Sequence, residues 1–194
     1  YLRSSEKEKT ITYALEAGMR SANLFANVDA HRFLTAGLVL VKEGEEATAA
    51  ALPEARKKTK LDYLRYLGDV CRVSGKSDGA KEAFNEAIPL AEELGEQFHL
   101  GRMLTSMAKV FQMLNDYPEA LKFTDRSIEV CRRLLQTHGI SAAHPGKVVL
   151  VGGPTVTPAL RARVRERSAA PFGGGLDPMT LVAQGAAIYA ATAG

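Results

Sequence analysis

One pattern of small and large apolar residues occurs twice in this chain, and it dictates most of the fold. The central copy reads Leu67-Gly68, Cys71, Ala80, Phe84 and Ala87. Forty residues on, from Leu67 to Met107, the downstream copy reads Met107-Ala108, Phe111, Leu114, Tyr117 and Ala120, with Thr124 and Ser127 in place of Phe84 and Ala87. Apolar residues at this spacing predict amphipathic helices, and the small residues mark where two helices cross closely.

A turn is predicted in the middle of each copy. Gly75 can end one helix, and the Ser and Asp residues around it can cap the next. Asn115-Asp116 takes the same place downstream. A weaker upstream copy sets Ala14, Gly18 and Ala22 opposite Ala30, Leu34 and Gly37. The sequence therefore predicts six helices in three antiparallel pairs up to about residue 136.

These offsets resemble the tetratricopeptide repeat (TPR), in the form of roughly forty residues found behind large bacterial signalling ATPases and transcriptional regulators. The resemblance covers residues 5–133 and implies a domain over residues 1–134, mainly α, folded as an α-solenoid of three helix pairs. In such arrays the first helix of each pair supplies a concave peptide-binding face. The positions implied for that face carry both charges: Asp62, Arg65, Asp69, Arg72, Arg102, Thr105, Lys109 and Gln112.

Mixed charge on this face suits a protein or peptide partner. It does not reproduce the Lys-plus-Asn clamp that some repeat proteins use on a terminal carboxylate, and Asp69 would repel one. A solvated charged face without a partner is the alternative.

The chain changes character after residue 134. Lys147 to Val151 is an apolar run of β-branched residues, a Gly-Gly turn follows, and a helix is predicted from Pro158. A buried strand that leads through a tight loop to a helix amino end lets backbone N–H groups approach a nucleotide. Because no second convincing strand is found in the sequence, we expect this one to lack ladder partners and to favour self-association.

Two motifs in this segment resemble the end of the ATPase domain of DnaK-type heat-shock chaperones, in the actin-like ATPase group. Residues 150–158 are similar to the family's Val-Gly-Gly-x-Thr-Arg-x-Pro, and residues 176–187 to its Asn-Pro-Asp-Glu-Ala-Val-Ala-x-Gly-Ala-Ala. The resemblance covers about residues 127–194. It implies that residues 135–194 form a small incomplete α/β fragment with one strand and two helices. The adenine-nucleotide half-site would contain Gly152, Gly153, Pro154 and Asp177.

Departures from the family weaken this half-site. The arginine that stacks on adenine in the family is Val156 here, and capping of the next helix is the alternative role of Asp177. The phosphate-binding loops and acidic metal ligands that phosphoryl transfer requires are not found in the sequence. Gly75-Lys76-Ser77 is no P-loop, since Val70 stands where that motif needs its first glycine. We therefore expect no catalytic residue, no metal site, no required cofactor, and only weak ATP or ADP affinity.

Charge and composition argue against two further classes of protein, nucleic-acid-binding and membrane-spanning ones. The net charge of +3 is carried by residues from Lys147 onward, so the helical part is near neutral, which argues against nucleic acid as a partner. No apolar stretch reaches the ~20 residues of a membrane span. Cys71 and Cys131 are expected to be buried free thiols, which favours a cytoplasmic location. A start at Tyr1, in a predicted helix, is typical of a piece of a longer protein.

The expected function is a non-enzymatic protein–protein interaction scaffold that carries an incomplete nucleotide half-site. Two alternatives stay open. The chain can be a fragment of an ATP-dependent DnaK-type chaperone whose remaining ATPase lobe is missing. It can also be the TPR segment of a bacterial signalling ATPase or regulator with an artefactual carboxyl-terminal junction. The join falls within one predicted helix, residues 120–136, which suits both patterns.

Overall fold

The computed structural model describes residues 2–46, 53–139, 149–152, 156–167, 172–173, 177 and 179–192. The chain divides into two compact units, Tyr1–Leu134 and Leu135–Gly194. The helices of the first are α1 (Leu2–Asn23), α2 (Asn27–Glu46), α3 (Glu54–Val73), α4 (Ser77–Glu93), α5 (Gln97–Met113) and α6 (Tyr117–Thr137), the last of which runs past the unit boundary. Those of the second are α7 (Pro158–Arg167) and α8 (Leu181–Thr192). The expected mainly α fold is confirmed.

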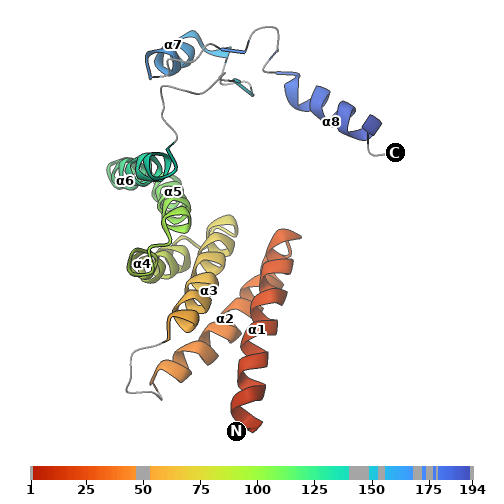
Figure 1. Ribbon diagram of the computed structural model, residues 1–194, viewed down its shortest axis with the longest axis vertical. Helices are drawn as coiled ribbons and strands as arrows, with labels where there is room; N and C mark the ends of the chain where they lie inside the picture. The colour runs from red at the N-terminus through yellow and green to blue at the C-terminus, as the bar shows by residue number, and fades with distance from the viewer. Residues whose placement is uncertain are drawn as a thin grey trace. The chain divides into compact units, whose positions relative to one another are not determined.

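The first six helices form the three predicted antiparallel pairs (Figure 1). α1 packs on α2 and α3 packs on α4. In the third pair the ring of Phe111 in α5 stacks on Phe123 in α6, with 5.4 Å between the ring centroids. α3 also contacts α2 and α1, and α5 contacts α4 and α3. The first helices of the pairs, α1, α3 and α5, therefore lie side by side in one layer.

Four turns of this unit have the same backbone conformation. Each holds one residue at positive φ: Phe25 (58°), Gly75 (73°), Gly95 (69°) and Asn115 (60°). The next residue donates its N–H to the carbonyl five positions back, as from Lys76 to Cys71 at 2.8 Å and from Asp116 to Phe111 at 2.9 Å. This is the Schellman motif, which satisfies the last carbonyls of the helix. Gly75-Lys76-Ser77 is thus a helix–helix turn, as predicted.

Close approach at a glycine defines how the first two pairs cross. A Cβ on Gly68 would lie 2.6 Å from the ring of Phe84, and a Cβ on Gly18 would lie 2.6 Å from the side chain of Leu34. Phe84 and Leu34 are fully buried. The predicted role of the small residues as crossing points is confirmed, since any side chain at Gly68 would push the α3–α4 pair apart.

Tyr63 in α3 ties the first pair to the second. Its ring is fully buried, and a Cβ on Gly37 of α2 would overlap the phenol. The hydroxyl donates to the Ile11 carbonyl of α1 at 2.5 Å. Burial raises the pKa of Tyr63 to about 12, so the phenol stays protonated and keeps this bond throughout the neutral range.

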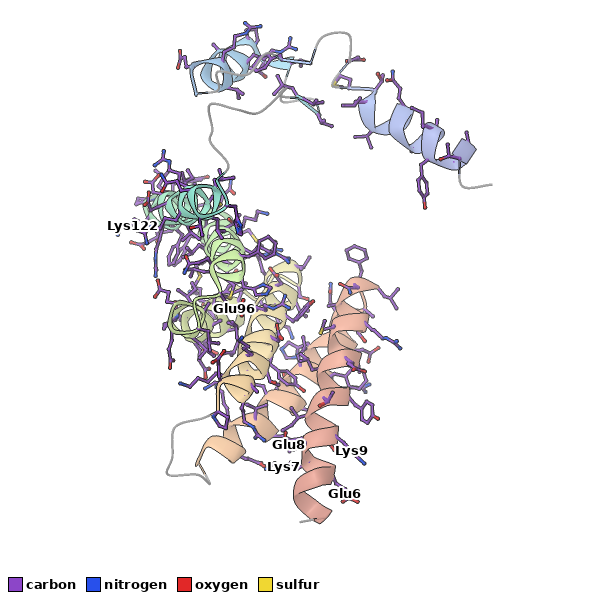
Figure 2. The ribbon with its side chains drawn as sticks, in the orientation of Figure 1. Glu6, Lys7, Glu8, Lys9, Glu96 and Lys122 are labelled. Carbon is purple, nitrogen blue, oxygen red and sulfur yellow. The ribbon has the colours of Figure 1, made fainter. Side chains whose placement is uncertain are left out.

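Ion pairs join neighbouring helices at the surface. Lys7 of α1 pairs with Glu43 of α2 at 3.0 Å, and Glu8 pairs with Arg56 of α3. In Figure 2, Lys7 and Glu8 lie on the side of α1 toward α2, whereas Lys9 lies on the other side. The side chains of Lys7, Glu43 and Glu8 are 38–55% exposed, so each pair adds little to stability.

The second unit departs from expectation at its strand. Residues 147 and 148 lie outside the described residues, and Val149 to Val151 form no strand. In the described ranges the only β assignment is a single bridge residue, Phe172. A strand needs ladder partners for its N–H and C=O groups, and the described part of the chain supplies no neighbouring strand. α7 and α8 occupy the positions of the two expected helices.

The prediction that both cysteines are buried is wrong for Cys131. Cys71 is buried, as expected, but Cys131 is exposed, and both are free thiols. The matching position of α4 is Ala91, which is fully buried in the helix stack. Cys131 therefore lies on a side of α6 that corresponds to a covered side of α4.

We predict that Phe84→Ala lowers the free energy of unfolding by about 3–5 kcal/mol, because the ring is fully buried over Gly68 and the cavity cannot close. Urea titration followed by circular dichroism measures the change. A loss below about 1 kcal/mol would contradict the pairing of α3 and α4.

Phe25 is the strained member of the four turns, since a bulky residue rarely takes positive φ and its side chain is 82% exposed. Phe25→Gly should therefore raise the free energy of unfolding by about 1 kcal/mol. Asn115→Gly is the matched control and should change it by less than about 0.5 kcal/mol, because asparagine tolerates this conformation. Equal shifts in the two thermal transitions would show that strain at Phe25 is absent.

Candidate functional site

The layer of first helices carries the residues that the repeat pattern places on a binding face. Asp62, Arg65, Asp69 and Arg72 lie on α3 and are half-buried; Arg102 and Lys109 lie on α5 and are exposed. Because α3 contacts α5, the structure brings these six residues onto adjoining helices. We call them the first-helix face.

The carboxylates of this face are already engaged by neighbours. Asp62 accepts a hydrogen bond from Arg65 Nε at 2.7 Å, and Asp69 pairs with Arg72 at 3.5 Å. Asp69 also accepts a hydrogen bond from the hydroxyl of Ser106 on α5 at 2.8 Å. The acidic groups are therefore neutralised within the face, while Arg102 and Lys109 have no ion-pair partner among the described residues. The face presents net positive charge to a ligand.

Two polar atoms at this face are buried without a hydrogen bond in the described part of the chain. They are Nε of Arg72 and Nδ1 of His99. Burial, and then the positive charge of Arg65, lowers the pKa of His99, so its ring is neutral at neutral pH. A buried polar atom without a partner is destabilising by about 1–3 kcal/mol. A ligand with polar groups could supply the missing hydrogen bond to either atom.

Sequence reasoning missed Ser106 and His99. Ser106 follows Thr105 in the helix and looks like any small residue, and its contact with Asp69 depends on the packing of α5 against α3. The half-buried position of His99 likewise depends on α3, which supplies Arg65 and Asp62.

The expected nucleotide half-site is described only in part. Gly153 and Pro154 lie outside the described residues. Gly152 has a φ of 90°, which favours glycine. The carboxylate of Asp177 accepts hydrogen bonds from the Met179 N–H at 3.0 Å and the Thr180 hydroxyl at 3.1 Å. Asp177 therefore caps the turn that leads into α8, which is the alternative role foreseen for it.

Neither a cluster of metal ligands nor a membrane-spanning helix is found in the described ranges. In these parts of the chain, no three His, Cys, Asp or Glu side chains lie together as a metal site would require. Each helix within them is too short or too polar to span a bilayer.

The model of the family "Hsp70 protein" matches residues 106–193. Chaperone protein HscA of Citrobacter koseri is 40% identical over 79 residues, which are 41% of this chain and 12% of that protein. Chaperone protein HscA of Escherichia coli O17:K52:H18 is 43% identical over 65 residues, which are 34% of this chain and 11% of that protein. No solved structure matches the chain significantly.

The carboxyl-terminal part of the chain is therefore similar to Hsp70-type chaperones, as the two motifs indicated. The chain spans only about an eighth of the length of these relatives. The match begins at residue 106 and not near 127, so it includes the end of α5 and all of α6.

We predict that Asp69 and Ser106 form one energetic unit across α3 and α5. Asp69→Asn and Ser106→Ala should each lower the free energy of unfolding by about 1 kcal/mol, and the double variant by clearly less than the sum. Urea denaturation of the four proteins measures the coupling. Strictly additive losses would mean that the 2.8 Å contact contributes nothing to stability.

Proposed function

We propose that the protein is a protein–protein interaction scaffold: a TPR-like helical array that carries a catalytically incomplete chaperone-type nucleotide half-site. The observation that carries this proposal is the layer of α1, α3 and α5, joined to their partners by identical turns. A layer of this kind offers an extended face on rigid helices, which suits recognition more than catalysis.

The partner proposed for the first-helix face is an acidic peptide or protein segment. Arg102 and Lys109 are exposed and have no ion-pair partner in the described ranges, while Asp62 and Asp69 are paired with arginines. A carboxylate ligand would meet these two free cations, and a polar ligand could also satisfy Nε of Arg72. The charge of Asp69 is offset by Arg72 and Ser106 and so repels such a ligand less than its sequence position suggests.

The half-site is proposed to bind adenine nucleotide weakly if at all. Gly152, Gly153, Pro154 and Asp177 would form one wall, and Val156 stands where a stacking arginine would add a cation–π contact of about 1 kcal/mol. Both carboxylate oxygens of Asp177 are engaged in capping. The exposed side chains of Val149 and Val151 support the further proposal that this segment associates with another chain.

The match to Hsp70 over residues 106–193 favours a second candidate. In this alternative the chain is a fragment of an ATP-dependent chaperone, and the missing ATPase lobe would supply the phosphate-binding loops. The two candidates differ in one respect that can be measured. A scaffold has no intrinsic ATP turnover, so any turnover by the purified chain that depends on the half-site would favour the chaperone fragment.

We expect the purified chain to hydrolyse ATP no faster than a buffer blank in a phosphate-release assay, because positioned cations and a positioned water are required. Gly153→Asp should behave like the unaltered chain, and so should Gly173→Asp, a matched change in a glycine outside both motifs. Turnover that is lost in Gly153→Asp but kept in Gly173→Asp would establish the chaperone alternative and reject the scaffold.

A further inference from the structure

A cavity of about 410 Å³ opens between the two helices of the downstream pair. Thr105, Ala108 and Lys109 of α5 line it, together with Tyr117, Leu121 and Thr124 of α6. Tyr117 is 57% exposed and Leu121 is 62% exposed. We call this cavity and the adjoining exposed side of α6 the α5–α6 groove.

The central pair shows what the downstream pair lacks. Phe84 fills the crossing of α3 and α4 from within and lies against Gly68. Forty residues on, the matching positions are Thr124 and Ala108. Thr124 is exposed, and its hydroxyl only donates to the carbonyl of Ala120 at 2.8 Å. The space that an aromatic ring occupies in the central pair is therefore open in the downstream pair.

The central pair also shows what kind of element covers the adjoining side of the second helix. α5 packs against α4 and α3, and Ile88 of α4 is only 5% exposed. Ile128, its counterpart on α6, is 40% exposed, and Cys131 is exposed where Ala91 is fully buried. Leu121, Ile128 and Leu135 recur every seven residues and leave an apolar stripe on α6. This side of α6 thus has the same apolar pattern as the side of α4 that α5 covers.

Charge indicates what that helix carries. In the central pair Asp69 accepts a hydrogen bond from Ser106 of the covering helix at 2.8 Å. The matching position of the downstream pair is Lys109, which is exposed and has no ion-pair partner among the described residues. A helix lying over α5 as α5 lies over α3 would place its own residue against this cation. A carboxylate there is the complementary group.

We propose that the α5–α6 groove docks an amphipathic helix of a partner protein. That helix inserts a large apolar side chain between Ala108 and Thr124, packs its apolar side on Leu121 and Ile128, and sets a carboxylate against Lys109. The site shares Lys109 with the first-helix face but otherwise lies on different residues, so variants at the α6 side test it separately from the proposed acidic-peptide face.

The test uses a fluorescein-labelled synthetic peptide with the α5 sequence, Gln97–Met113, carrying Ser106→Glu. By the repeat spacing its new carboxylate would face Lys109. Fluorescence anisotropy against the full chain should show saturable binding. The double variant Ala108→Gly/Thr124→Phe rebuilds the central crossing, closes the cavity from within and should weaken binding at least about tenfold. It leaves all six residues of the first-helix face unchanged.

A charge exchange gives an independent readout. Lys109→Glu in the chain should weaken binding of the Ser106→Glu peptide, and a peptide with Ser106→Lys should restore it. Circular dichroism of each variant would check that it is folded. Absence of binding by the unaltered chain would overturn the proposal. Equal binding by the double variant would do the same, because binding would then not depend on the open space between Ala108 and Thr124. Failure of the exchanged pair to restore binding would remove Lys109 from the site.

Discussion

The stacking of the first two helix pairs depends on one contact, the approach of a large side chain to a glycine where the two helices cross. Phe84 lies against Gly68, and Leu34 lies against Gly18, at distances that leave no room for a Cβ. This contact fixes how close the two helices of a pair come. Once that distance is set, the positive-φ turns can join them with only a few residues, and the first helices fall into one layer.

The downstream pair departs from this arrangement and is held in another way. Ser127 replaces the alanine of the central pair; its hydroxyl lies 2.8 Å from that of Thr105 and donates to the Gly101 carbonyl at 3.1 Å. Polar bonds and the stacked rings of Phe111 and Phe123 thus join α5 to α6 in place of a ring buried at the crossing. A pair joined at its edges can keep a space in its middle, which explains why the groove is found here.

Local pattern was enough to predict the helices, because each crossing and each turn is set by residues close together in sequence. Gly75 and Asn115 identify helix ends whatever surrounds them. The features that were missed depend on distant parts of the chain. Cys131 is exposed because, within the described residues of the first unit, no further helix covers that side of α6, and Asp69 meets Ser106 only because α5 packs on α3. The expected strand does not form at Val149–Val151, because the described residues supply no neighbouring strand. For the half-site, sequence identified a capping role for Asp177 correctly, whereas the positions of Gly153 and Pro154 lie outside the described residues.

The two thiols differ in exposure, so they can be labelled separately and used to follow binding and unfolding. Cys71 is enclosed in the core, and burial raises the pKa of its thiol, so it resists alkylation while the fold is intact. Cys131 is open to solvent on α6, beside the apolar stripe. A maleimide dye would therefore attach at a single known point on the native chain. Its emission would follow the occupancy of α6, and delayed labelling of Cys71 would follow the opening of the core.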